Sequence, residues 1–244
     1  MAVTQESPKP ALTAFESWSP ASLARWSPAA FPTGDGGTWT WAEPGAQVHA
    51  EAGRLVLAVP RFTRSHDTVQ IFDNPKHLLA CRDPIPVPDG GVEVEVSMGA
   101  TMHPAAGEDW DLGFASFNLM DFEHGLILDG LADGTRTAIL FERLHVPGMI
   151  PEDQAWTAIA DGPRSPRPGT EHAFRFRYEP SERRARGWID GVPVLEVKGV
   201  PFRITAFTPG IGVITLARIR DGRSQSLRDQ GCTATVGAIH VVSP

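Results

Sequence analysis

The densest cluster of polar side chains in the chain consists of Asp121, Glu123 and His124, which lie between two apolar segments. An imidazole beside a carboxylate can act as a general base, and the same side-chain types can bind a metal ion. The alternative is a polar β-turn that Asp121 caps and Gly125 bends. Because successive side chains of a strand point to opposite faces, at most two of the three can enter one pocket.

A second candidate group is Glu142-Arg143-Leu144-His145, which follows an apolar segment. Alternation places Glu142 on one face with Leu144, and Arg143 on the other with His145. Arg143 and His145 could bind an anionic or carbonyl oxygen in a cleft, whereas a structural ion pair between Glu142 and Arg143 explains the same residues equally well. If these groups catalyse, Glu142→Gln and His124→Ala should each lower turnover by about 10²-fold or more.

Lys76 and His77 form a third candidate pair, because one of only three lysines stands beside a histidine ahead of the apolar Leu78-Leu79-Ala80. A buried lysine with a lowered pKa can act as a base or form a Schiff base. A surface lysine with a buried stem is the commoner arrangement. His77 is the neighbouring candidate for acid–base chemistry.

Seven tryptophans against one tyrosine is an unusual ratio. Trp39 and Trp41 are two residues apart and therefore share a strand face, while Trp110, beside Asp111, and Trp188 belong to other elements that one cleft could unite. Aromatic walls bind sugars, and they also bind flat apolar ligands. For at least half of the tryptophans, filling the core is the default role.

Several common sites are not expected. The eight histidines have no short metal-ligand spacing, and the chain has no Asp-rich calcium loop, so we expect no metal and no cofactor, and activity that survives chelation. No Gly-rich phosphate loop follows a predicted strand. Cys81 and Cys232 could pair, but two free thiols are favoured in a chain of this size.

The elements that must position these residues are β-strands. The segment from His172 to Val197 predicts a three-stranded meander, because Phe174, Phe176 and Tyr178 alternate with charged residues and Asp190-Gly191 is a tight-turn sequence. The three rings should face the core. Helix is expected in fewer than a tenth of the residues, with one short helix or turn after Ser19-Pro20.

Val92-Glu-Val-Glu-Val96 is the cleanest alternation, with the valines inward and Glu93 and Glu95 on the opposite face. The connection from 146 to 170 is typical of a functional lid or rim. Further strands are predicted at residues 38–41, 47–50, 54–59, 68–72, 112–120, 126–128, 137–144, 155–159, 210–219 and 232–242.

Length and composition favour one large all-β domain over residues 14–244, preceded by a disordered arm at residues 1–13. A net charge of −7 offers no basic surface for phosphates, so nucleic acid is not an expected partner. The sequence contains neither a secretory signal nor an apolar run that could span a membrane, so a cytoplasmic location is expected. Monomer and homodimer both remain open.

The aromatic strand Phe174 to Tyr178, the following Gly187-Trp-Ile-Asp-Gly191, the strand Leu112 to Phe117 and the closing Ala238 to Val242 together resemble the concanavalin A-like lectin and glucanase superfamily. The resemblance covers roughly residues 90–242. It implies a jelly-roll of two antiparallel sheets, and it extends to bacterial single-domain members without assigned activity. This architecture hosts lectins, glycosidases, lyases and adhesion modules.

The chain departs from the family's hydrolytic motif. Glucanases of this kind carry a Glu-x-Asp-x-x-Glu strand, and that spacing does not occur here. Glu93-Val-Glu95 is the nearest approach. Two glutamates on one strand face could serve a retaining mechanism, but a solvated outer face is the favoured interpretation.

These observations predict a cofactor-independent enzyme that acts on a small organic metabolite, apolar or glycosylated, in an aromatic-lined cleft. Cyclisation, isomerisation, elimination and hydrolysis all fit the candidate groups. The alternative is a lectin-like carbohydrate-binding module or a glycoside hydrolase with displaced carboxylates. An enzyme for an apolar metabolite predicts a closed cavity, whereas a lectin predicts an open groove of exposed tryptophans.

Overall fold

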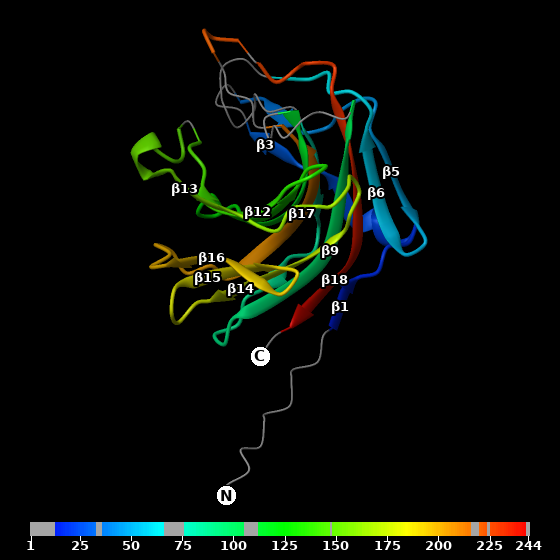
Figure 1. The fold of residues 1–244 in the computed structure, drawn as a ribbon. Helices are drawn as coiled ribbons and strands as arrows, with labels where there is room; N and C mark the ends of the chain where they lie inside the picture. The colour runs from blue at the N-terminus through cyan, green and yellow to red at the C-terminus, as the bar shows by residue number, and fades with distance from the viewer. Residues whose placement is uncertain are drawn as a thin grey trace, which may run out of the picture.

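The structure, a computed structural model, describes residues 13–32, 36–65, 76–104, 112–146, 148–215, 220–223 and 225–242. It confirms the predicted jelly-roll, in which two antiparallel sheets stack face to face (Figure 1). Sheet A contains, in spatial order, β16 (Val192–Lys198), β15 (Arg184–Ile189), β14 (His172–Glu179), β9 (Val92–His103), β18 (Gly231–Val242), β6 (Arg54–Val59) and β5 (Gln47–Glu51), with β1 (Thr13–Glu16) paired to β18.

Sheet B contains, in spatial order, β13 (Trp156–Asp161), β12 (Thr137–Arg143), β11 (Leu126–Ala132), β10 (Phe114–Asp121), β17 (Ala206–Ile214), β7 (Lys76–Cys81) and β2 (Trp26–Pro28), with β8 (Ile85–Pro86) paired to β17. A separate two-stranded ribbon is formed by β3 (Ala30–Pro32) and β4 (Thr38–Thr40). The helices of the described residues are two single 3-10 turns, η1 (Ser22–Arg25) and η3 (Glu152–Gln154). The prediction of very little helix is therefore confirmed for this part of the chain.

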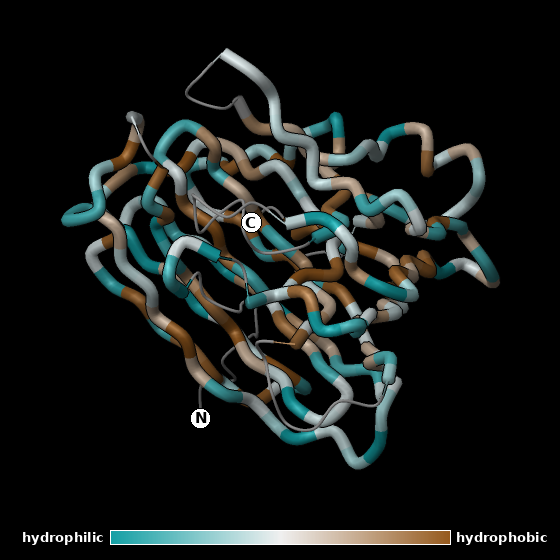
Figure 2. Tube along the Cα trace, turned by 90° about the horizontal axis from the view of Figure 1, so that it is seen from above, coloured by the Kyte–Doolittle hydropathy of each residue, from teal (hydrophilic) through white to brown (hydrophobic). Residues whose placement is uncertain are grey.

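The core lies between the two sheets, as the sequence periodicity predicts. Phe174, Phe176 and Tyr178 are each 1% exposed, and Phe176 packs against Phe117 of sheet B with 5.8 Å between ring centroids. In Figure 2 the hydrophobic stretches lie mainly in the interior, and the hydrophilic ones follow the outer turns. The meander and its inward rings are confirmed.

Gly130 of β11 allows the aromatic rings of sheet A to approach sheet B. A Cβ added there would lie 2.6 Å from Cδ1 of Phe174 and 2.9 Å from Cζ of Phe176. We expect Gly130→Ala to lower the free energy of unfolding by about 1–3 kcal/mol, because both rings are fully packed. Urea denaturation measures the change. In the control Gly45→Ala an added Cβ meets nothing within 4 Å, and an equal loss in both variants would contradict the packing argument.

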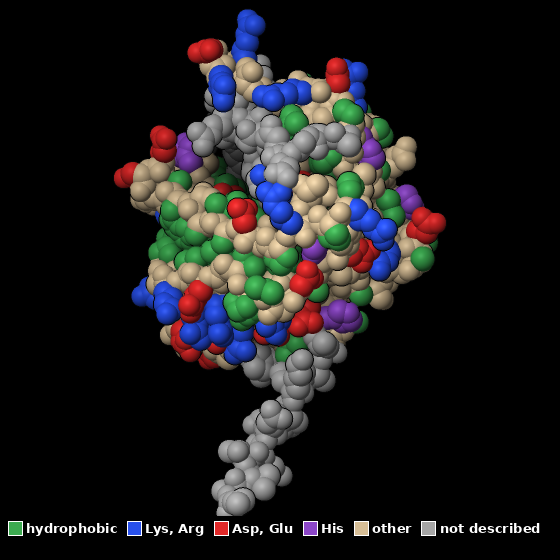
Figure 3. All heavy atoms as spheres, viewed as in Figure 1, with side chains coloured by type: hydrophobic (Ala, Val, Ile, Leu, Met, Phe, Trp, Pro, Cys, Tyr) green, Lys and Arg blue, Asp and Glu red, His purple; other side chains and the backbone are tan. Residues whose placement is uncertain are grey.

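The outer face of sheet A carries a network of ion pairs at the position of Glu93. Glu93 lies within ion-pair distance of Arg175 and Arg177, at 4.0 and 3.9 Å, and charged side chains of both signs cover the part of Figure 3 occupied by β14–β16. Trp188 lies beneath the guanidinium groups of Arg175 and Arg186, whose carbons are 4.3 and 5.3 Å from its ring centroid. The favoured interpretation of the Glu93-Val-Glu95 segment, a solvated outer face, agrees with this placement.

Other sequence predictions concern the cysteines, the termini and membrane segments. Cys81 and Cys232 are both buried and free, as favoured. The expected arm lies outside the described residues except for Thr13, which begins β1, and the strand predicted at residues 68–72 also lies outside them. Within the described ranges, no helix has the length and apolar character needed to cross a membrane.

Candidate functional site

A cavity of about 580 Å³ lies on the face of sheet B that points away from sheet A. The strands of sheet B form its floor, because residues that alternate with the core side chains point to this side. Residues of the β3–β4 ribbon and of the turn at 145–150 close it from the sides. The residues that line it are Phe31, Trp41, Lys76, Leu78, Phe114, Asn118, Met120, Asp121, Phe122, Gly125, Leu126, Ile127, Asp129, Leu131, Leu140, Glu142, Leu144, His145, Val146, Met149, Ile150, Thr157, Ile159 and Ile214.

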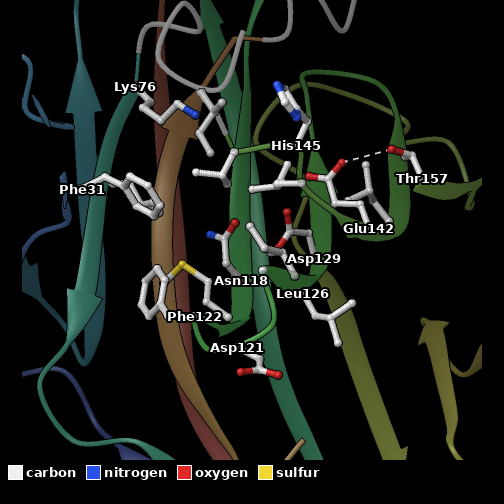
Figure 4. A pocket seen from close by; sticks show the side chains of 18 of the residues that line it. Phe31, Lys76, Asn118, Asp121, Phe122, Leu126, Asp129, Glu142, His145 and Thr157 are labelled. Atoms are coloured by element: carbon white, nitrogen blue, oxygen red, sulfur yellow. Dashed lines mark hydrogen bonds between the residues drawn. The ribbon is translucent and has the colours of Figure 1, made fainter. Parts of the chain in front are cut away.

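Two carboxyl groups meet on the floor of the cavity. Asp129 of β11 is paired with Leu140 of β12, and Glu142 of β12 is paired with Ile127 of β11. Asp129 and Glu142 are therefore diagonal neighbours on adjacent strands, a relation that sets their Cα atoms roughly 7–8 Å apart. Figure 4 shows both carboxyl groups directed into the same space.

The environment of the pair favours the protonated form of the acids. Asp129 is only 7% exposed, and burial raises its pKa well above the usual range, to which the charge of Glu142 adds. Burial also raises the pKa of Glu142, while a hydrogen bond from the Thr157 hydroxyl (3.2 Å) and the ammonium of Lys76 oppose that shift. The pair therefore retains a proton at pH values where isolated carboxyl groups are ionised.

Asn118 of β10 is placed to accommodate either charge state of Asp129. When Asp129 is ionised, the amide nitrogen of Asn118 donates to both carboxylate oxygens, at 3.0 and 3.2 Å, and its oxygen accepts from the Ser116 hydroxyl. When Asp129 is protonated, the Asn118 amide takes the opposite orientation. Its oxygen then accepts a hydrogen bond from the carboxyl O–H, and its nitrogen donates to Ser116 Oγ at 3.0 Å. A carboxyl group held in both states can give up and regain a proton without losing its partner.

Lys76 and the aromatic side chains Trp41 and Phe31 form one wall of the cavity. The ammonium of Lys76 lies 4.9 Å from the Trp41 ring centroid, and Phe31 packs on the same ring at 5.9 Å. Trp39 lies opposite Phe31 on the β3–β4 ribbon and packs against the same hydrophobic cluster as Trp41, with its ring under the guanidinium of Arg64 at 4.7 Å. Of the two tryptophans, only Trp41 lines the cavity itself.

The segment Asp121–Gly125 forms a polar turn, which is the alternative to a catalytic cluster. Asp121 Oδ1 accepts the backbone N–H of Glu123 at 3.0 Å, Asp121 Oδ2 lies 2.7 Å from Nδ1 of His124, and Gly125 has a φ of +69°. His124 stacks on Phe202 with 4.5 Å between centroids. Of the three polar residues only Asp121 lines the cavity, so the structure does not bring Glu123 and His124 to it.

Within the described part of the chain, Asp121, Glu123 and His124 are also the group of side chains that could hold a metal ion. Their ligand atoms lie within 4.8 Å of one another. However, the hydrogen bond between His124 and Asp121 already uses an atom of each that a metal ion would need. The arrangement is explained by the turn.

Arg143 and His145 lie on different sides, contrary to the face that alternation predicts for them. The Arg143 guanidinium lies 4.6 Å from the Phe202 centroid and donates to the His124 carbonyl at 3.0 Å, away from the cavity. His145 lines the cavity, and its Nδ1 lies 2.8 Å from the Ile150 carbonyl oxygen. The reason is that β12 ends at Arg143, so alternation holds for Glu142 but not for His145.

His77 and Trp188 are not part of the cavity, and Trp110 and Asp111 lie outside the described residues. His77 is 6% exposed on the core side of β7, where its Nδ1 accepts the backbone N–H of Glu43 at 3.2 Å and burial lowers its pKa. A neutral, structural imidazole fits these contacts. The candidates that do line the cavity are Trp41, Lys76, Asp121, Glu142 and His145.

Asn118 and Asp129 line the cavity but are not among the residues predicted from the sequence. Asp129 is followed by Gly130, and the Asp-Gly pair is a typical turn sequence, so the predicted strand ended at residue 128. The available signal was a polar residue inside an apolar segment, Leu126-Ile-Leu-Asp-Gly-Leu131, since a carboxyl group is rarely buried in a core strand without a function.

A second constellation has the connectivity of a serine–histidine–aspartate triad. Ser165 Oγ lies 2.8 Å from Nε2 of His172, whose Nδ1 lies 2.7 Å from Asp190 Oδ2. However, the backbone N–H of Ser165 donates to the Thr135 carbonyl, and Pro166 has no N–H. The two amides that usually stabilise an oxyanion next to the nucleophile are therefore not available. We assign the group to holding the connection before β14 against the β15–β16 turn.

Removal of the His172 imidazole tests that structural role. We expect His172→Ala to lower the free energy of unfolding by about 1–3 kcal/mol, because the buried imidazole that is hydrogen-bonded to both Ser165 and Asp190 is lost. Ser165→Ala, which removes one half-buried hydroxyl, should cost less. Urea denaturation gives both values, and a fluorophosphonate reagent should not label Ser165. Labelling that requires His172 would instead identify a nucleophilic site.

A family model described as "Family of unknown function (DUF6081)" matches residues 23–244. The chain belongs to this family. A sequence search of curated proteins finds no match.

Solved structures resemble the fold at low sequence identity. An endo-1,3-beta-glucanase from Streptomyces sioyaensis has a TM-score of 0.58 at 13% identity, covering 98% of this chain and all of the other. A prokaryotic beta-1,3-1,4-glucanase (lichenase) from a mouse hindgut metagenome has a TM-score of 0.54 at 13% identity, with 95% and 97% coverage. The metal-free carbohydrate recognition domain of Emp46p has a TM-score of 0.52 at 11% identity, with 90% and 88% coverage. Likeness at these identities establishes the concanavalin-like fold alone.

Proposed function

We propose that the protein is an acid–base enzyme that cleaves a glycosidic or closely related acetal C–O bond of a small molecule in the cavity on sheet B. The observation that carries this proposal is the pair Asp129 and Glu142, two carboxyl groups with raised pKa values on the floor of one cavity. Two carboxyl groups in different environments are the usual equipment for acetal hydrolysis.

The environments of the two acids assign their roles. Asp129, the more deeply buried, keeps its proton and donates it to the leaving oxygen as the C–O bond breaks. Glu142 is half-buried, accepts the Thr157 hydroxyl and lies in the field of Lys76, so it is the one of the pair that ionises and activates the attacking water or attacks the carbon. If Glu142 activates the water, the proton it takes from that water returns to Asp129 through solvent. If Glu142 attacks the carbon, Asp129 regains a proton from the water that cleaves the glycosyl ester on Glu142. Both routes restore the starting state.

The glucanases among the similar structures support this chemistry, although they are too distant to assign it. Here the two acids come from adjacent antiparallel strands, which explains why no single-strand carboxylate motif occurs in the sequence. Cyclisation or isomerisation of a small metabolite by the same pair is the second candidate, favoured by the apolar lining of the cavity. Incorporation of water into the product distinguishes hydrolysis from these reactions.

The test is release of 4-nitrophenol from a panel of aryl glycosides across acid and neutral pH. We expect turnover by the wild-type protein and background rates for the double variant Asp129→Asn/Glu142→Gln. The double variant keeps both side-chain shapes, so thermal unfolding should show that it is folded. Equal rates for the two proteins would refute the assignment of the pair, and no turnover of any glycoside would refute the hydrolytic proposal.

A further inference from the structure

Most polar groups of the cavity are already engaged within the protein. Asn118 is bonded to Ser116 and Asp129, Thr157 donates to Glu142, and Nδ1 of His145 is bonded to the Ile150 carbonyl oxygen. Asp121, at one end, holds His124 and the Glu123 backbone. A glycan chain in the cavity would need partners for many hydroxyl groups, and unpaired buried hydroxyls are costly. The cavity can therefore satisfy one polar region of a ligand, at the carboxyl pair.

The rim of the cavity is apolar and exposed. Among the described residues five large apolar side chains are exposed, and three of them line this cavity: Phe122 at 47%, Met149 at 62% and Ile159 at 50%. They belong to three different elements, the β10–β11 turn, the turn at 145–150 and β13. Exposed apolar side chains gathered at one opening mark a binding surface, whereas single ones scattered over a protein need no explanation.

Glu142 of the carboxyl pair lies next to the exposed edge strand β13. Thr157, which binds Glu142, and Ile159 are exposed residues of the edge strand β13, whereas Asp129 is buried farther inside the sheet. Figure 4 shows Glu142 and Thr157 together at one side of the cavity, with Phe31 and Phe122 on the opposite side. A sugar at the Glu142 side would keep its hydroxyl groups in water while its acetal oxygen reaches the acids.

We infer that the substrate is a glycoside of a compact, mainly apolar molecule, whose apolar part fills the cavity and extends over Phe122, Met149 and Ile159. The inference rests on the proposed function, because it assumes that the acetal oxygen is the one polar group of the substrate that lies inside the cavity. The volume of about 580 Å³ lies within the range of pockets that enclose small organic ligands. Among the described residues that line the cavity, most polar side chains already have partners within the protein, which argues against a polysaccharide as the occupant.

The experiment uses n-alkyl 1-thio-β-D-glucosides from butyl to octyl, whose sulfur linkage resists acid-catalysed cleavage. Calorimetric titration of the wild-type protein, below the micellar concentration, should show binding that tightens about threefold to fourfold per methylene group. Phe122→Ser, Met149→Ser and Ile159→Ser should each weaken octyl binding by about 5-fold and change butyl binding little. The matched controls are Val192→Ser and Leu227→Ser, the two exposed apolar residues away from the cavity, which should bind as the wild type does.

An affinity independent of chain length, no binding of the whole series, or equal effects of rim and control variants would overturn the inference. Tight binding of a β-1,3-linked glucose tetrasaccharide, with an affinity that the rim substitutions do not change, would also overturn it. Since the thioglucosides are not turned over, the two proposals fail separately. A normal chain-length dependence without turnover of any oxygen glycoside refutes only the reaction, and turnover with a flat chain-length dependence refutes only the substrate class.

Discussion

Asp129→Asn is expected to lower the turnover of an alkyl glycoside by about 10²- to 10⁴-fold, the usual contribution of one positioned acid. An alkoxide is a poor leaving group and needs the proton that Asp129 supplies. The 4-nitrophenolate ion leaves without a proton, so turnover of the nitrophenyl glycoside should fall much less in the same variant. This difference between substrates is a property of the leaving-group acid and not of a general loss of structure.

Glu142→Gln is expected to lower turnover of both substrates by about the same factor, because the attacking group is needed whatever leaves. Glu95→Gln, the same carboxyl-to-amide change on the outer face of sheet A, serves as the control and should retain full activity. If Asp129→Asn slowed both substrates equally while its melting temperature was no lower than that of the wild type, Asp129 would not be the leaving-group acid. Initial rates on the two substrates decide the matter.

The fold could be predicted from the sequence because the decisive pattern is local. In Phe174 to Tyr178 and in Val92 to Val96, every second side chain is apolar, and this period alone fixes the inner face of β14 and of β9. The tight turn at Asp190-Gly191 then makes β15 and β16 neighbours. Nothing in these steps requires knowledge of distant contacts.

The site could be predicted only in part because it depends on pairing between strands. Alternation correctly placed Glu142 on the same face as Leu144, and it failed for His145, which lies beyond the end of β12. The partner of Glu142 is Asp129, which only the register of β11 against β12 brings close. A single sequence does not specify that register, so Glu142 was predicted without its partner Asp129.

Loss of activity in Asp129→Asn should be accompanied by a gain in stability at neutral pH. Burial raises the pKa of Asp129 in the folded protein well above its ordinary value of 3.8. Between that value and the raised pKa, the folded state binds more protons than the unfolded state, so the wild-type free energy of unfolding falls as pH rises through this window. Asparagine carries no charge and keeps the contact with Asn118, so the free energy of unfolding of the variant does not fall over this pH range.

The melting temperatures of the two proteins should therefore agree at pH values below 3.8 and diverge as pH rises, with the variant the more stable. For a domain of this size each kcal/mol corresponds to about 2–4 °C. Glu142→Gln should act in the same direction, and the double variant should gain less than the sum, because removing either charge relieves the other acid. Calorimetric melting across this pH range measures all four proteins. A variant less stable than the wild type at neutral pH would mean that the carboxylate of Asp129 stabilises the fold, and its assignment as the acid would be withdrawn.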